Sequence, residues 1–158
     1  GLSVAIGAAL AKRVEGDDNI VFVLMGDGEL QEGQIWEAAM FAGSNLLTNL
    51  IAVVDYNGQQ IDGKVNDVLS LGNLREKWES FGWDVIEKNG NHYEEIKETL
   101  VLAKSNRERK KPLCILMSTV MGKGVDFMEN NHKWHGSPPS REQLENALSQ
   151  LPSELEDY

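Results

Sequence analysis

Two side chains that could share a metal ion follow two apolar, strand-like runs of this sequence. Asp27 stands between two glycines directly after the apolar run 20–25, and Asn57 follows the apolar run 49–54. Carboxylate and amide oxygens are the ligands that a hard divalent cation prefers. The flanking glycines let the backbone come close to a ligand. The pattern therefore predicts a divalent cation that holds a diphosphate, which points to a cofactor.

The segment that follows the Gly-Asp-Gly turn is typical of a helix. We expect helical character between Leu30 and Gly43, with the regular helix over 31–42. The first N–H groups of a helix have no partner within it and face outward with partial positive charge, so they can bind an anion. The sequence therefore predicts phosphate binding where this helix begins.

The composition excludes some classes of function. The chain has 158 residues, 41% of them hydrophobic, and a formal net charge of −10. This length suits one domain with a full core. An acidic surface argues against nucleic acid as a partner, so backbone N–H groups and a metal must hold any phosphate. The single cysteine, Cys114, lies in the apolar run 112–117 and is expected in the core. One cysteine allows no disulfide within the chain, which fits a reducing, cytoplasmic location.

No apolar run reaches the roughly 18 to 20 residues that span a bilayer, so no membrane partner is expected. The opening run 1–11 is rich in alanine but has neither a methionine nor a basic segment before it, unlike a signal peptide. We instead expect this run to form an alanine-rich helix that belongs to the interior of a longer protein sequence. We expect one domain over 1–158 that is incomplete at its N-terminus, with no linker and no internal repeat.

Strand-like and helix-like stretches alternate along the chain, which predicts a doubly wound α/β domain with a mostly parallel sheet and helices on both faces. The expected strands are 20–25, 49–54, 83–87 and 113–118, and the expected helices are 3–15, 31–42, 74–81, 93–105 and 141–151, with a polar loop over 56–71. Ligands of such sheets bind at the carboxyl ends of the strands. Gly28, Asn57 and the segment 119–136 all follow strand ends, so we expect them to converge on one edge.

Three runs of the sequence together resemble a known motif. They are GDGELQEGQIWEA at 26–38, NLIAVVDYN at 49–57 and IDG at 61–63. This combination looks like the thiamine-diphosphate motif of transketolases. It is most similar to the N-terminal subunit of split bacterial transketolases, in which two genes encode the two halves. The runs FMENN at 127–131 and WHG at 134–136 also resemble that subunit, so the resemblance covers essentially the whole chain and implies a thiamine-diphosphate-binding fold.

The resemblance implies a set of metal ligands. Asp27 and the side-chain oxygen of Asn57 would bind Mg²⁺ or Ca²⁺, and the backbone carbonyl of Gln59 would be the third protein ligand. Diphosphate oxygens and a water would complete the octahedral, all-oxygen coordination. Gly28 would donate its backbone N–H to the diphosphate, in agreement with the predicted helix start.

The resemblance also implies further cofactor-binding residues. Gly1 matches the last glycine of a Gly-Gln-Gly motif of the family, and Gly26 and Glu29 belong to the diphosphate motif itself. Ile61 matches a residue beside the thiazolium ring. His135 matches a histidine near the diphosphate and the substrate entrance. It is the candidate catalytic residue, for proton transfer or for orienting the diphosphate.

Other polar residues leave alternatives open. Glu32 matches a residue at a dimer interface, or it is a solvated glutamate favoured by a helix start. Lys123 could reach an anionic ligand, or it is a solvated loop lysine. His132 is interpreted as a loop residue. With His135 it could imitate a zinc site, but no cysteine or third histidine accompanies the pair, so zinc is rejected.

The resemblance implies the diphosphate- and metal-anchoring half of a transketolase, which transfers a two-carbon ketol unit from a ketose phosphate to an aldose phosphate. A C-terminal subunit with the pyrimidine-binding domain would complete the site in an α2β2 or dimeric assembly, and this chain alone would be inactive. The sequence leaves three alternatives. They are a 1-deoxyxylulose-5-phosphate synthase, the α subunit of a 2-oxo-acid dehydrogenase, and a catalytically silent scaffold of the same fold.

Overall fold

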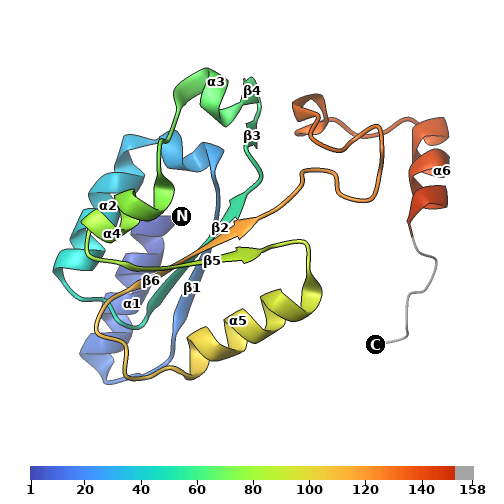
Figure 1. Cartoon of the computed structure of the whole chain (residues 1–158). Coiled ribbons are helices and arrows are strands. Elements are labelled where there is room, and N and C mark those ends of the chain that lie inside the picture. Colours follow the sequence, from blue (N-terminus) through green and yellow to red (C-terminus); the bar gives the residue numbers. More distant parts are fainter. Residues whose placement is uncertain (152–158) are drawn as a thin grey trace.

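Four parallel strands form the central sheet, in the order β1-β2-β6-β5 (Figure 1). The strands of this computed structural model are β1 (Val21–Gly26), β2 (Leu50–Tyr56), β5 (Asp84–Asn89) and β6 (Leu113–Ser118). The structure describes residues 1–151, so the last seven residues of the predicted domain 1–158 lie outside the described residues. Because all four strands run in the same direction, their carboxyl ends meet at one edge of the sheet.

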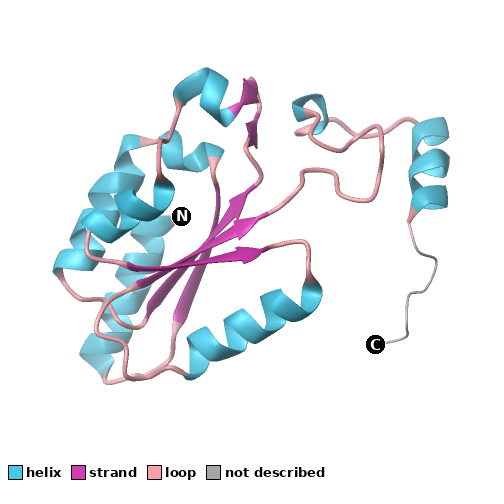
Figure 2. Ribbon diagram, viewed as in Figure 1, coloured by secondary structure: helices cyan, strands magenta, loops and turns pink. Residues whose placement is uncertain are grey.

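Four of the described helices pack on the two faces of the sheet (Figure 2), namely α1 (Leu2–Glu15), α2 (Gly33–Ser44), α4 (Leu74–Ser80) and α5 (Tyr93–Ser105). The described residues also form the helices α3 (Val65–Leu69) and α6 (Arg141–Gln150), together with the 3₁₀ turns η1 (Gly28–Gln31) and η2 (His132–Trp134). The predicted α/β architecture with a mostly parallel sheet is confirmed. Among the described residues, no helix is long and apolar enough to cross a bilayer.

The larger core lies between the sheet and helices α1, α2 and α4. Trp78 and Trp83 are fully buried there, with ring centroids 4.8 Å apart and nearly perpendicular planes. The indole N–H of Trp83 donates to the carbonyl of Ala39, at 2.8 Å. A side chain at Gly43 would come within 1.8 Å of the carbonyl oxygen of Phe81, so α2 can pack this closely only with glycine there.

The opposite face of the sheet is covered in part, by α5. A second cluster joins Ala103 of α5 to Ile51, Ile115 and Met117 of the sheet. Strand β1 carries no helix on this face, and Leu24 is 72% exposed there. The prediction of helices on both faces is therefore right, but only part of the second face is buried by the described residues.

The predicted helix 31–42 is not continuous with the Gly-Asp-Gly turn. Bonds from Leu30 N to Asp27 O and from Glu32 N to Glu29 O form the 3₁₀ turn η1 instead. Glu32 then has extended backbone angles, φ −74° and ψ 125°, and α2 begins after it. The first N–H groups after Asp27 therefore belong to η1, which corrects the expectation of an α-helix start at the site.

The polar stretch 56–71 is not a plain loop. It contains a short antiparallel hairpin, β3 (Gln59–Gln60) with β4 (Gly63–Lys64), and then α3. The side-chain amide of Gln31 donates to the carbonyl of Leu69, at 2.8 Å, and so ties this segment to η1. Two-residue strands carry no alternation of apolar and polar residues, so the sequence pattern did not reveal them.

The segment after β6 extends beyond the carboxyl edge of the sheet and leads to α6 on its far side (Figure 1). A capping box between Ser140 and Gln143 begins this helix. The side chain of Gln150 exchanges hydrogen bonds with Asp126, at 2.8 Å each, and so fixes the helix to the segment. Cys114 of β6 is buried without a partner, and burial raises the pKa of its thiol, as expected for a core residue.

Candidate functional site

The carboxyl ends of β1, β2 and β6 bring the predicted site together. In the sheet register, Gly26 pairs with Asp55, and Tyr56 pairs with Ser118. The N–H of Asp27 donates to the carbonyl of Asp55 at 3.1 Å. The segments that carry Asp27, Asn57 and 119–136 therefore do start from one edge, as the topology predicted.

Asp27 is buried, with 1% of its surface exposed. Its Oδ2 accepts a 2.6 Å hydrogen bond from the N–H of Gly58, whereas its Oδ1 is buried without a hydrogen-bond partner among the described residues. Burial raises the pKa of the Asp27 carboxyl. Hydrogen bonds from the backbone N–H groups of Gly58 and, to a smaller extent, Gly28 lower this pKa and oppose the effect of burial. The charge of Asp55 raises that pKa further.

A buried carboxylate oxygen without a partner is costly. A cation bound at Oδ1 would remove this cost, because it would compensate both the charge and the missing hydrogen bond. Gly58, whose N–H contacts Asp27, stands between Asn57 and Gln59. Their amide and carbonyl oxygens are of the kind that suits Mg²⁺ or Ca²⁺. The residues present therefore fit a hard divalent cation.

The two glycines of the turn differ in their surroundings. A Cβ atom at Gly28 would lie 2.8 Å from the Cβ of Gln60, so the turn packs directly against strand β3 and admits no side chain there. A Cβ atom at Gly26 would have no atom of the described residues within 4 Å, apart from its two chain neighbours. Open space therefore adjoins the backbone of Gly26, where a ligand can approach closely.

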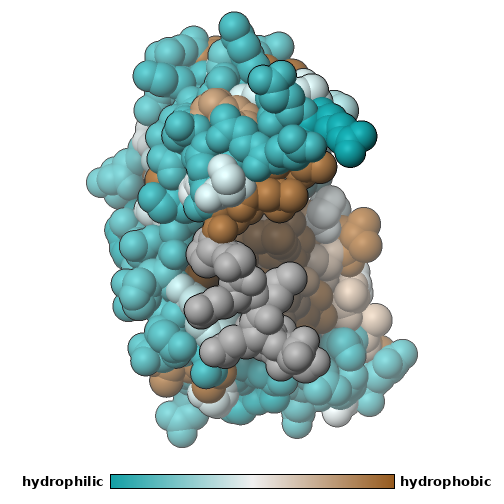
Figure 3. All heavy atoms as spheres, turned by 90° about the vertical axis from the view of Figure 1, so that its right-hand side faces the viewer, coloured by the Kyte–Doolittle hydropathy of each residue, from teal (hydrophilic) through white to brown (hydrophobic). Residues whose placement is uncertain are grey.

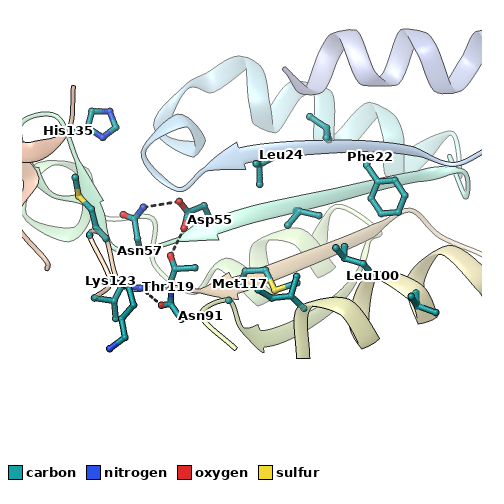
Figure 4. A pocket seen from close by; sticks show the side chains of 18 of the residues that line it. Phe22, Leu24, Asp55, Asn57, Asn91, Leu100, Met117, Thr119, Lys123 and His135 are labelled. Atoms are coloured by element: carbon teal, nitrogen blue, oxygen red, sulfur yellow. Dashed lines mark hydrogen bonds between the residues drawn. The ribbon is translucent and has the colours of Figure 1, made fainter. Parts of the chain in front are cut away.

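A hydrogen-bonded network orients Asn57 (Figure 4). Its amide nitrogen donates to Oδ2 of Asp55 at 3.2 Å, and its amide oxygen accepts from the N–H of Gln59 at 2.8 Å. The other oxygen of Asp55 accepts a hydrogen bond from the hydroxyl of Thr119. Sequence reasoning missed Asp55 and Thr119. Asp55 is a charged residue at the carboxyl end of an apolar strand, two residues before Asn57, a signal that could have revealed it.

The hairpin β3–β4 carries two more predicted residues. Gln59 is half-buried at its start, and Ile61 lies at its turn with 67% of its surface exposed. Gly1 and Glu29 lie next to each other, since a Cβ atom at Gly1 would be 3.0 Å from the Glu29 carboxylate. The same Cβ atom would be 3.8 Å from Val23 of β1, so this pair lies beside the edge strand.

His135 lies at the same end of a cavity as Asn57 (Figure 4). The His135 side chain is exposed, and the backbone N–H of His135 donates to the backbone carbonyl of His132 at 2.9 Å. The preceding Trp134 packs on Phe127, with ring centroids 5.4 Å apart, and donates its indole N–H to the Phe127 carbonyl. The Trp-His-Gly loop therefore has its own anchor, which holds His135 near the carboxyl edge.

The cavity itself, of about 1050 Å³, continues from the polar edge onto the open face of β1. Its walls away from Asn57 are apolar and include Phe22, Leu24, Val53, Leu100 and Met117. Figure 3 shows this apolar surface as a hollow on one side of the molecule. The predicted strand 20–25 was correct, but its exposure was not foreseen, since an unbroken apolar run is typical of a strand buried on both faces.

Lys123 and Glu32, for which the sequence left two interpretations each, are both exposed in the structure. Lys123 lies 3.5 Å from the carboxylate of Glu129 and is 58% exposed, in agreement with a loop lysine. The pKa of Glu129 is lowered, first by the N–H of Gly124 and then by the charge of Lys123. Glu32 is exposed at the start of α2, and its side chain makes no capping hydrogen bond there. No three His, Cys, Asp or Glu side chains form a metal-binding group within residues 1–151.

The carboxyl edge of this parallel sheet carries a glycine turn, a buried carboxylate and an oriented amide. This arrangement is typical of an α/β domain that binds a phosphate-bearing cofactor. Residues 1–156 match the family described as "Transketolase, thiamine diphosphate binding domain". The chain therefore belongs to this family, as the resemblance implied.

Relatives with curated descriptions cover almost the whole chain. It is 42% identical over 156 residues to one subunit of the apulose-4-phosphate transketolase of Phocaeicola vulgatus, and this match covers 99% of the chain and 55% of the relative. It is also 42% identical over 154 residues to the 6-deoxy-6-sulfo-D-fructose transketolase subunit SqwG of a Clostridium species, covering 98% and 55%. The chain thus spans about half the length of these relatives.

Solved transketolases have the same fold over this region. The enzyme of Campylobacter jejuni superposes with a TM-score of 0.80 and 34% identity, over 94% of this chain and 23% of that one. Transketolase from Leishmania mexicana superposes with a TM-score of 0.83 and 31% identity, with the same coverage. The fold class is therefore confirmed by structures as well as by sequence.

Proposed function

We propose that this chain is the diphosphate- and metal-anchoring part of a thiamine-diphosphate-dependent transketolase, which transfers a two-carbon ketol unit from a ketose phosphate to an aldose phosphate. One observation carries the proposal. Asp27, in the motif of the family, is buried at the carboxyl edge of the sheet, and one of its carboxylate oxygens has no hydrogen-bond partner within residues 1–151. A bound cation would offset the cost of burying this oxygen. Backbone N–H groups of the adjacent glycine turn could then bind a phosphate next to the cation.

The proposed metal is Mg²⁺ or Ca²⁺. Its ligands from this chain would be a carboxylate oxygen of Asp27, the amide oxygen of Asn57 and the backbone carbonyl of Gln59. The hydrogen bond from Gly58 to Asp27 supports this set, because it ties the loop after β2 to the turn after β1. Diphosphate oxygens and water would complete the coordination of the cation.

The remaining residues of the site would bind and orient the cofactor. The N–H of Gly28 would donate to the diphosphate, beside Gly26 and Glu29, and Ile61 would pack beside the thiazolium ring. Gly1 would lie at the margin of the site. When bound, thiamine diphosphate would supply the carbanion-stabilising chemistry that cleavage of a ketose requires.

His135 is proposed to orient the diphosphate or to move a proton at the substrate entrance. Its place on the rim of the cavity that also reaches Asn57 supports this role. The indole anchor of the neighbouring Trp134 supports it as well, because a catalytic side chain needs a fixed backbone.

A partner subunit is part of the proposal. The family requires a pyrimidine-binding domain, and no part of this chain resembles one. Two of the relatives are named as transketolase subunits, which supports a companion C-terminal subunit in a two-fold α2β2 or dimeric assembly. Glu32 is a candidate for that interface. The chain alone would bind cofactor weakly and turn nothing over, and the complex would work in the cytoplasm.

Reconstitution tests this function. The purified chain, mixed with a transketolase C-terminal subunit, thiamine diphosphate and Mg²⁺, is expected to transfer a ketol unit from xylulose 5-phosphate to ribose 5-phosphate. Product analysis with pyruvate in the same mixture would reveal a synthase or a 2-oxo-acid dehydrogenase instead. A folded mixture that binds cofactor but acts on none of these substrates would favour a silent scaffold.

A further inference from the structure

We propose that Asp55 is a positioning residue that determines which atom of the Asn57 amide faces the metal, and that Thr119 holds Asp55 in place for this task. The proposal deepens the proposed function and rests on it in so far as a metal binds at Asn57. None of the roles that the family motif implies involves Asp55 or Thr119. Asp55 lies near the end of β2 and Thr119 directly follows β6, and these two strands pair at the carboxyl edge.

The side-chain amide of Asn57 is nearly symmetric in shape. The oxygen and the NH₂ group of an asparagine occupy almost the same space, so a rotation of 180° exchanges an acceptor for two donors. Only the oxygen can bind a cation. An unconstrained Asn57 would therefore present the wrong atom in part of its population, and this would weaken the metal site.

Asp55 removes this ambiguity. An ionised carboxylate only accepts hydrogen bonds, and its Oδ2 lies 3.2 Å from the amide nitrogen of Asn57. The flipped amide would place two oxygens at this distance, where they repel. The N–H of Gln59, at 2.8 Å from the amide oxygen, favours the same orientation from the other side.

Thr119 fixes Asp55 in turn. Its hydroxyl donates to Oδ1 of Asp55, and its backbone N–H donates to the carbonyl of Tyr56 at 3.2 Å. Both carboxylate oxygens of Asp55 are therefore engaged within the protein, one by Asn57 and one by Thr119. Outer residues that hold a metal ligand in this way typically change metal affinity by about 10- to 100-fold when they are removed.

Substitutions at Asp55 separate positioning from direct ligation. Asp55→Leu keeps the shape of the side chain but removes the acceptor, and it is expected to weaken Mn²⁺ binding by about 10- to 100-fold. Asp55→Asn still accepts from Asn57 through its oxygen, and it is expected to lose only about threefold, the difference between a charged and a neutral acceptor. If Asp55 were itself a ligand, Asp55→Asn would remove a negative charge from the cation, and its loss would be far greater than threefold.

A swapped pair gives a sharper test. Asn57→Asp supplies a stronger ligand but places two carboxylates next to each other, so its Mn²⁺ affinity is expected to fall. The double variant Asp55→Asn with Asn57→Asp restores a donor and an acceptor and is expected to recover most of the affinity. Thr119→Val should weaken binding, and Thr119→Ser, which keeps the hydroxyl, should not.

The measurements are Mn²⁺ titrations by calorimetry on the chain mixed with a transketolase C-terminal subunit and thiamine diphosphate, together with the side-chain amide signal of Asn57 in ¹H–¹⁵N spectra of the metal-free chain. The spectra report the amide orientation even if the wild-type mixture binds no Mn²⁺, which would overturn the proposed function alone. The positioning role is overturned if the Asn57 amide signal is the same in Asp55→Leu as in wild type. It is equally overturned if Asp55→Asn binds Mn²⁺ as weakly as Asp55→Leu, or if the swapped pair does not recover affinity.

Discussion

The N–H of Gly58 donates a 2.6 Å hydrogen bond to Oδ2 of Asp27, across 31 residues of sequence. This bond joins the turn after β1 to the loop after β2, and it leaves Oδ1 of Asp27 buried without a partner among the described residues. One half of the carboxylate therefore builds the site, and the other half is free to bind a ligand. This division explains how a single acidic residue can be both structural and functional.

The burial of Asp27 gives the metal-free chain a distinct pH dependence. The pKa of this carboxyl is raised above the value of about 3.9 in an unfolded chain. The folded state therefore holds the proton more tightly, and the free energy of unfolding falls as pH rises from about 4 through the raised pKa. Asp27→Asn removes this loss, so the variant should gain stability relative to wild type between about pH 4 and pH 7.

Urea denaturation of both chains at several pH values, without divalent cations, measures this difference. Asp18→Asn is the matched control, since Asp18 is exposed and lies away from the site. It should show no such trend. A difference between Asp27→Asn and wild type that is constant with pH would contradict the raised pKa of Asp27.

The two glycines of the turn should separate stability from binding. Gly28→Ala forces a Cβ atom to within 2.8 Å of Gln60, and we expect a loss of about 1–3 kcal/mol in the free energy of unfolding. Gly26→Ala brings its Cβ atom within 4 Å of no described residue except its two chain neighbours, so the metal-free chain should lose less than about 0.5 kcal/mol. The added methyl group should instead weaken thiamine diphosphate binding. Chemical denaturation and calorimetry on both variants check this, and equal stability losses would refute the assignment.

Neighbouring residues on β1 test whether its outer face is open in solution. Met25 is 1% exposed and Leu24 is 72% exposed. We therefore expect Met25→Ala to lower the free energy of unfolding by about 2–5 kcal/mol and Leu24→Ala by less than about 0.5 kcal/mol. If Leu24→Ala costs as much as Met25→Ala, the apolar face of β1 must be covered in solution.

The thiol of Cys114 should report unfolding of the sheet. Burial raises its pKa and keeps reagents away, so it should react with a disulfide reagent only in molecules that have opened the sheet. The reaction rate should rise with urea in parallel with the loss of the CD signal. Fast labelling of the native chain would contradict the burial of β6.

The convergence of the site could be predicted because the topology follows from the alternation of strands and helices. Parallel strands place every βα turn at one edge, so Asp27 and Asn57 had to meet once their strands were neighbours. Asp55 could not be identified as a site residue from its residue type alone. Its proposed role depends on hydrogen bonds to two residues that lie 2 and 64 positions away in the sequence.

Two features depended on packing that local sequence does not encode. The break at Glu32 follows from the 3₁₀ bonds around Leu30, and helix propensity gives no sign of it. The exposure of Phe22 and Leu24 follows because α5 covers the other strands on this face and no described helix covers β1. A run of apolar residues shows which side chains can be buried, but not which of them are covered.

The central claim is that Asp27 anchors thiamine diphosphate through a divalent cation. Calorimetric titration of thiamine diphosphate into the chain mixed with a transketolase C-terminal subunit, with Mg²⁺ and with EDTA, tests it most directly for wild type and for Asp27→Ala. We predict saturable binding by wild type that requires Mg²⁺ and disappears in Asp27→Ala. Equal affinity in Asp27→Ala, or binding by wild type that persists in EDTA, would contradict the claim.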